Sequence, residues 1–278
     1  MALNTDLALE SFNDVQKAEK LSGVESAEYT DSAAELKITE INVLTQEAAK
    51  RLGKPIGRYI TLESETPLGE YTPCFEERCR AVCEALKKLC SDGPTLFVGL
   101  GNRKITPDSL GPLTADRIFA TRHIKRLAKE IDSSDLSETS VFSAGVMAQT
   151  GFETAELAEA VCAACSPAQV IVCDALACCE PTHMGRTIQL CSTGISPGSG
   201  VENSRQELSE KTLGVPVAAV GIPLVSRAMS ENQRFSDLLV TPKAVDRLAE
   251  QGSAIIAGGV NMLLHPSLTL SEIASLTL

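Results

Sequence analysis

The chain has 278 residues, of which 44% are hydrophobic and only 4% aromatic, and it contains no tryptophan. Its net charge of −11 argues against a nucleic-acid-binding surface, and no apolar run reaches the roughly 20 residues that cross a bilayer. The first ten residues lack a basic segment followed by an apolar core, so we expect no signal peptide. A core of small aliphatic side chains is typical of layered α/β proteins.

The N-terminal third begins with about 30 polar and acidic residues of little periodicity, a pattern that predicts a loosely held arm. Hydrophobic alternation then indicates a strand with one solvent-facing side, and Thr45 and Gly53 are suited to cap and end a short helix. The elements expected before residue 95 are a strand at 35–44, a helix at 46–52, a strand at 58–62 and a helix at 76–90.

From residue 95 the chain alternates between strand and helix patterns. Strands are expected at 95–101, 141–147, 169–174, 187–192 and 216–222, and helices at 113–131, at 154–165 and from Thr241-Pro242 onward. This alternation predicts an α/β fold of three layers, in which helices cover both faces of a mostly parallel central sheet. With no internal repeat or linker, we expect a single domain over 31–278 behind an arm over 1–30.

Asp108 and Asp174 are the candidate catalytic residues, because each follows a hydrophobic strand pattern. Ligands of open α/β sheets collect beyond the carboxyl ends of the strands, and two carboxylates delivered there could share a proton and activate a water. Each residue also has an ordinary interpretation, Asp108 as a helix N-cap and Asp174 as a turn residue. The order of the strands, and with it the distance between the two carboxylates, is left open.

Two glycine-rich loops are candidates for binding a substrate. Gly101 and Asn102 close a Gly-Leu-Gly-Asn turn, but Lys104 stands where a dinucleotide fingerprint needs its third glycine. The turn therefore either permits close packing or belongs to an active-site loop that directs Asp108 to the sheet edge. The second loop is either a plain connection or presents backbone N–H groups to a substrate carbonyl or anion; its candidate residues are Gly198, Ser199 and Gly200.

The ten cysteines and three histidines form no recognisable metal or nucleophile motif. Cys162 and Cys165 make a CxxC, but no second pair or neighbouring histidine completes a zinc site. Without a secretion signal, reduced and mostly buried thiols are expected. Neither GxSxG nor HExxH occurs. We therefore expect no metal ion and no cofactor, and hydrolysis through a serine or cysteine is unsupported.

Several short motifs follow one another over most of the chain, at 57–64, 98–112, 145–147, 150–151, 174–177, 197–200, 213–216, 221–223, 240–243 and 257–259. In this order they resemble the germination proteases of spore-forming bacteria, endopeptidases that degrade small acid-soluble spore proteins. The resemblance implies an atypical acid protease of the spore core cytoplasm, with Asp108 and Asp174 as its catalytic pair. It also implies a fold similar to that of the hydrogenase-maturation peptidases.

The same resemblance implies a homotetramer that is made as a zymogen and removes its own N-terminal peptide. The segment Thr-Asp-Leu-Ala at 5–8 is similar to the family's cleavage pattern, which places the scissile bond between Asp6 and Leu7 and the propeptide at 1–6. Small acid-soluble spore proteins are the implied substrates, and neither nucleic acid nor a membrane is an expected direct partner. The ordinary interpretation of the segment is a disordered arm.

Two features depart from the family pattern. Residues 226–239 replace a much longer family segment, which bears on the tetramer and on the activity of this short form, and Ser196 stands where a histidine is expected. Two alternatives remain beside the aspartate-dependent endopeptidase. One is a metal-assisted peptidase related to the hydrogenase-maturation proteases, with the aspartates as ligands. The other is a non-catalytic binding protein on the same fold.

Overall fold

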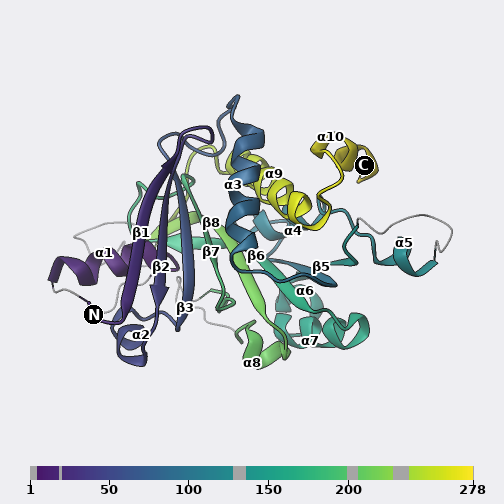
Figure 1. Ribbon diagram of the computed structural model, residues 1–278, viewed down its shortest axis with the longest axis horizontal. Coiled ribbons are helices and arrows are strands. Elements are labelled where there is room, and N and C mark those ends of the chain that lie inside the picture. The colour runs from purple at the N-terminus through teal and green to yellow at the C-terminus, as the bar shows by residue number, and fades with distance from the viewer. Residues whose placement is uncertain (1–4, 19–20, 128–135, 199–205, 228–237, 278) are drawn as a thin grey trace.

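A mixed nine-stranded sheet forms the centre of the part of the protein that the structure describes (Figure 1). The computed structural model describes residues 5–18, 21–127, 136–198, 206–227 and 238–277. The strands are β1 (Val24–Asp31), β2 (Leu36–Val43), β3 (Gly57–Ser64), β4 (Thr95–Leu100), β5 (Thr139–Gly145), β6 (Gln169–Cys178), β7 (Thr187–Cys191), β8 (Val217–Arg227) and β9 (Leu239–Val240). Their order is β1-β2-β3-β7-β8-β6-β4-β5, with β9 paired to β8.

The sheet has a parallel half and an antiparallel half. Strands β8, β6, β4 and β5 pair in parallel, whereas β1, β2, β3 and β7 pair antiparallel and join the parallel half through β7 and β8. The expected α/β class is confirmed. The parallel arrangement is confined to one half of the sheet, because β1, β2, β3 and β7 each run antiparallel to the strand beside them.

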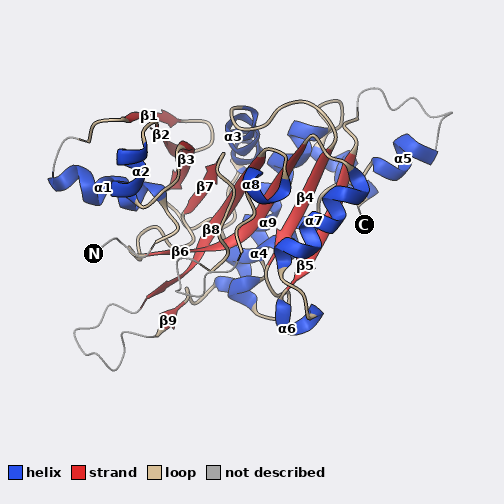
Figure 2. Cartoon of the chain, turned by 90° about the horizontal axis from the view of Figure 1, so that it is seen from below, coloured by secondary structure: helices blue, strands red, loops and turns tan. Residues whose placement is uncertain are grey.

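Helices cover both faces of this sheet, which gives the expected three layers (Figure 2). The helices are α1 (Ala8–Ala18), α2 (Gln46–Leu52), α3 (Phe75–Lys87), α4 (Leu110–Ala115), α5 (Arg122–Leu127), α6 (Met147–Thr150), α7 (Thr154–Cys165), α8 (Glu210–Leu213), α9 (Val245–Leu264) and α10 (Leu270–Leu276), with a 3-10 turn η1 at Thr106–Asp108. Side chains alternate across β6, where Ile171 packs with α3, α4 and α9, and Val172 packs with α7 and α8.

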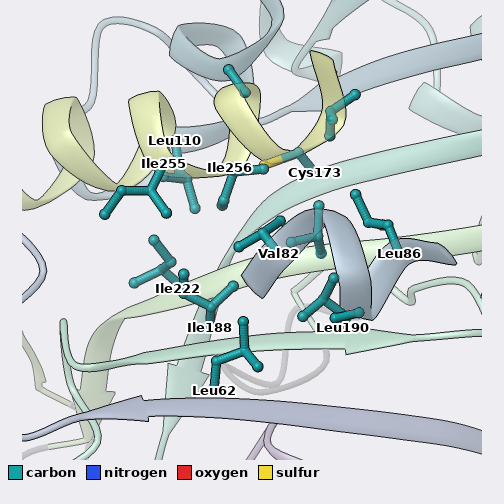
Figure 3. Packing of buried hydrophobic residues seen from close by; sticks show 14 of the residues in the cluster. Leu62, Val82, Leu86, Leu110, Cys173, Ile188, Leu190, Ile222, Ile255 and Ile256 are labelled. Atoms are coloured by element: carbon teal, nitrogen blue, oxygen red, sulfur yellow. The ribbon is translucent and has the colours of Figure 1, made fainter. Parts of the chain in front are cut away.

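The larger core lies between the sheet and the helices α3, α4 and α9 (Figure 3). Aliphatic side chains fill it, including Leu62, Val82, Leu86, Leu110, Ile188, Leu190, Ile222, Ile255 and Ile256. The glycine pair Gly258-Gly259 lets α9 approach α3, since an added Cβ would lie 2.5 Å from the Cys79 sulfur and 2.6 Å from Val82. These two glycines therefore allow a close helix–helix contact between α9 and α3. All ten cysteines are free thiols, and seven are buried.

The helix expected over 113–131 is broken in the structure. Helix α4 ends at Ala115 and α5 begins at Arg122, and residues 128–135 lie outside the described part. Between these helices the backbone of Phe119 bonds to the C-terminal end of α9 and not within a helix. Phe119 N donates to Asn261 Oδ1 at 3.0 Å, and Phe119 O lies 3.0 Å from His265 Nε2. These tertiary contacts outweigh the local helical pattern.

Other boundaries also depart from the expectation. Strand β6 continues past residue 174 to Cys178, because β8 pairs with it along that length. Helix α9 begins at Val245, with Ala244 as its N-cap, whereas Thr241-Pro242 was expected to open it. Residues 8–18 form α1 and residues 24–31 form β1, and Leu7, Ala8 and Leu9 are buried, so the start of the chain is docked and not loosely held. The division of the chain at residue 30 stays a prediction.

The sequence predicted the limits of α2 and α7 correctly. Thr45 caps α2 by accepting a hydrogen bond from Ala48 N, and Gly53 ends it in the left-handed conformation at φ +64°. Helix α7 covers the expected range. Among the described helices, none is long and apolar enough to cross a membrane.

Candidate active site

Asp108 lies in the loop that follows β4, at the end of the turn η1. The chain leaves β4 through Gly101 at φ +109°, where an added Cβ would lie 2.1 Å from the Asp108 carbonyl oxygen, so only glycine fits. Asp108 Oδ2 accepts a hydrogen bond of 2.8 Å from the backbone N–H of Asn102. The N-cap of α4 is Ser109, so Asp108 does not cap that helix. Its carboxylate instead faces back onto the glycine turn.

Asp174 lies inside β6 and is 6% exposed. The pairing of β4 with β6 ends at Gly99 and Cys173, so Asp174 is the first residue of β6 that no longer pairs with β4. On its other side it still pairs in parallel with Gly221 of β8. Asp174 Oδ1 accepts a hydrogen bond of 2.8 Å from Ala175 N. Strand β6 continues through Asp174, so the residue does not lie in a turn. It is one position past the last pair of the β4–β6 ladder, at the level of the final residue of β4.

Both aspartates line one cavity of about 270 Å³. Gly101 and Gly198, two of the candidate substrate-binding residues, line it as well. Asn102 does not: its side-chain oxygen accepts hydrogen bonds from Gln149 Nε2 and Lys104 N. Candidate residues Ser199 and Gly200 lie outside the described part of the chain.

The N-terminal segment enters the same cavity through Asp6. Asp6 N donates to Ala177 O at 3.0 Å, and Asp6 Oδ2 accepts from Ala177 N at 2.8 Å. Leu7 is fully buried beside Leu176 and Cys178. The stretch Thr5-Asp6-Leu7 is therefore held at the end of β6, on Leu176 to Cys178.

The carbonyl oxygen of Asp6 accepts two side-chain hydrogen bonds. Lys54 Nζ donates to it at 2.9 Å and Gln189 Nε2 at 2.8 Å, and Lys54 also donates to Thr5 O at 2.8 Å. Burial lowers the pKa of Lys54, and the nearby Asp6 carboxylate opposes that shift. Sequence reasoning missed both side chains; the one available signal was a glutamine inside the apolar strand β7.

Glu10 anchors the start of α1 to the loop after β6. Its side chain is 1% exposed, and it accepts hydrogen bonds from Cys179 N at 2.8 Å and Glu180 N at 2.9 Å and from the Thr5 hydroxyl. His183 Nδ1 lies 2.7 Å from Glu10 Oε1. Burial raises the pKa of Glu10, but these hydrogen bonds outweigh it and leave the pKa lowered. The bond to Glu10 in turn raises the pKa of His183. The sequence did not single out Glu10.

No group of three or more His, Cys, Asp or Glu side chains within the described ranges is arranged to hold a metal ion.

Comparison with known proteins relates most of the chain to one family. A family model described as germination protease matches residues 4–235. The germination protease of Clostridium tetani is 36% identical over 324 residues, covering 99% of both chains. That of Caldanaerobacter subterraneus subsp. tengcongensis is 34% identical over 322 residues, covering 99% of this chain and 98% of the relative.

Among solved structures, the NiFe hydrogenase maturation protease HycI from Thermococcus kodakarensis is similar with a TM-score of 0.37 and 16% identity. The match covers 63% of this chain and 98% of the other.

Proposed function

Since this chain belongs to the germination protease family and is an endopeptidase, we propose that it begins the degradation of small acid-soluble spore proteins in the core of the germinating spore. We propose further that Asp108 and Asp174 together activate the water that attacks the peptide bond. The observation that supports this assignment is that the two side chains, carried by different segments, line one cavity. No metal ligand or nucleophilic serine or cysteine enters the proposal.

In the proposed reaction, one carboxylate is ionised and accepts a proton from the attacking water. The other carboxyl is protonated and gives its proton to the leaving nitrogen. A pair of neighbouring carboxyls is suited to these two roles, because like charges in one site favour a single shared proton. The cavity also receives the Asp6 side chain, an acidic residue that precedes an apolar one.

We propose that the protein is made as a zymogen and cleaves itself between Asp6 and Leu7. Asp6 lines the cavity of the two aspartates, and one backbone and one side-chain hydrogen bond hold it on Ala177 of β6. While it stays there, it occupies the place of a substrate. Latency and self-processing would then have one cause. A homotetramer, implied by the family resemblance, is a further proposal that sedimentation would test.

Mass spectrometry tests the self-processing directly. Wild-type protein and the Asp174→Asn variant are incubated under mildly acidic conditions, and their N-termini are determined. We expect a new N-terminus at Leu7 in the wild type alone. Identical intact masses, in a wild-type preparation that cleaves an added peptide, would show that the segment is no propeptide.

A further inference from the structure

We propose that Lys54 and Gln189 are catalytic residues that bind the carbonyl oxygen of the scissile bond and stabilise the negative charge that develops on it. This inference rests on the proposed cleavage between Asp6 and Leu7, and it adds two residues that the aspartate pair does not account for. A water that attacks the Asp6 carbonyl carbon converts its oxygen into an oxyanion, which needs hydrogen-bond donors already in place.

The distances fit this role. Lys54 Nζ lies 2.9 Å and Gln189 Nε2 lies 2.8 Å from the same Asp6 oxygen, within the range of about 2.7–3.1 Å at which such donors act. The lysine supplies a positive charge and the glutamine a neutral N–H. Because Lys54 is partly buried, its charge acts on that oxygen through a medium less polar than water.

Gln189 is held within a strand, and Lys54 lies in the bend that follows α2. Gln189 lies in the middle of β7, where Thr61 of β3 and Gly221 of β8 flank it in register, and it is 6% exposed. Lys54 follows the left-handed Gly53 that ends α2, and its backbone N–H donates to Ala49 O at 3.1 Å. Donors fixed in advance need little rearrangement when charge develops, which is the condition for strong electrostatic stabilisation.

Gln189 also spans the bond that is proposed to break. Its Nε2 donates to Asp6 O at 2.8 Å, and its Oε1 accepts from Ala8 N at 2.5 Å. The Leu7 side chain is held by the apolar contacts of Leu176 and Cys178. Contacts therefore fix the residues on both sides of the Asp6–Leu7 bond.

Two independent observations point to the same bond. The residue pattern of 5–8 singles out the Asp6–Leu7 bond through similarity to a family cleavage pattern, without reference to any contact. The geometry, without reference to that pattern, brings two side-chain donors from distant elements onto the oxygen of that bond. An anchor for the N-terminal segment would need only some backbone oxygen, and Lys54 already has Thr5 O for that purpose.

The step balances as ordinary hydrolysis. The water oxygen bonds to the Asp6 carbonyl carbon, and the water proton passes to the ionised carboxylate of the aspartate pair. The carbonyl electron pair moves onto the oxygen held by Lys54 and Gln189. It returns when the carbon–nitrogen bond breaks and the Leu7 nitrogen takes the proton of the other carboxyl. The products are a carboxylic acid at Asp6 and an amine at Leu7, and neither donor exchanges a proton.

The decisive experiment is the rate of self-processing in the full chain. Appearance of the Leu7 N-terminus is followed by mass spectrometry for the wild type, Lys54→Met, Gln189→Met and the control Lys50→Met, which alters an exposed lysine of α2. We expect the Lys54 and Gln189 variants to be slower by about 10²–10³-fold, the usual effect of losing one oxyanion donor. The control should match the wild type.

A second measurement separates catalysis from anchoring. Hydrogen exchange at the amides of Asp6, Ala177 and Cys179 reports whether the segment stays docked, because none of these amides bonds to Lys54 or Gln189. Slow processing with wild-type protection supports the inference, and Lys54→Arg, which keeps a cationic donor, should recover part of the rate. Slow processing with lost protection would mean that the side chains only anchor the segment, and wild-type rates in both Met variants would also overturn the inference.

Gln189→Glu gives an independent readout if a Lys54 variant fails to fold. A protonated glutamic acid can donate to the carbonyl oxygen and an ionised one cannot, so its rate relative to wild type should fall as pH rises. A pH-independent ratio overturns the role of Gln189. A wild-type chain that never yields a Leu7 N-terminus would instead overturn the proposed self-cleavage, and this inference with it.

Discussion

The two halves of the sheet contribute different parts of the candidate site. The parallel half carries Asp108 and Asp174, which follow or extend beyond the buried strand β4. The antiparallel half and its helices carry Lys54 and Gln189, and the N-terminal segment docks between these two residues and the end of β6. In the proposed site, the aspartate pair thus comes from the half with the regular α/β pattern, and the two donors to the scissile carbonyl come from the half that departs from it. The junction at β7, β8 and β6 joins the two.

The largest expected effect is the loss of activity when either aspartate of the parallel half is replaced. Asp108→Asn and Asp174→Asn should each lower kcat on a peptide that carries Thr-Glu, an apolar residue and Ala by about 10²–10⁴-fold, since each removes one acid–base group. Thermal unfolding should show that both variants remain folded. Asp92→Asn, in an exposed position before β4, is the matched control. Near-normal turnover in either active-site variant would rule out the pair.

An intermediate effect is expected where the N-terminal segment is anchored. Glu10→Ala removes a buried carboxylate that accepts hydrogen bonds from Cys179 N and Glu180 N, so the free energy of unfolding should fall by about 1–3 kcal/mol. Urea titration measures this change. Asp14→Ala removes an exposed carboxylate from the same helix and should change stability by less than about 0.5 kcal/mol. Equal effects of the two substitutions would contradict the anchoring role of Glu10.

The same division explains what the sequence predicted. Local patterns marked the strands that lead to Asp108 and Asp174, and local capping residues such as Thr45 and Gly53 gave α2 its limits. These signals lie within a few residues of what they specify. They placed each aspartate at the end of its own strand pattern, which holds for Asp108 after β4, whereas β6 runs on past Asp174 to Cys178.

The rest depends on contacts between distant residues. Lys54 and Gln189 reach Asp6 across 48 and 183 positions, and Asn261 interrupts the expected long helix by binding Phe119 across 142. The polar N-terminal segment docks because Glu10 finds partners in the loop after β6. No periodicity in the segment itself carries this information, because hydrophobic pattern reports burial within one element and not the partner that covers it.

The smallest expected effect is a dependence of the unfolding free energy on pH through the pair Glu10 and His183. Glu10 and His183 shift in opposite directions, the carboxyl to a lower pKa and the imidazole to a higher one. The Glu10 contribution to stability is present above its unfolded pKa of about 4.3 and is lost as pH falls through the lowered folded pKa. The His183 contribution is present below about pH 6.5 and is lost as pH rises through the raised folded pKa.

Their pairing should therefore stabilise the N-terminal segment most between about pH 4.5 and 6.5. Glu63, whose Oε1 lies 3.5 Å from His183 Nε2, adds to the preference for a charged imidazole. The difference in unfolding free energy between the wild type and His183→Gln should be largest in this window. It should decline by an amount on the order of 1 kcal/mol toward pH 9, since one pKa unit corresponds to about 1.4 kcal/mol.

His123→Gln, which alters an exposed histidine of α5, is the control and should show no such profile. A difference for His183→Gln that stays constant from pH 5 to 9 would mean that the imidazole is neutral against Glu10. The pair would then be an ordinary hydrogen bond. A declining difference, with the control flat, would assign part of the docking of the N-terminal segment to a charge that weakly alkaline conditions remove.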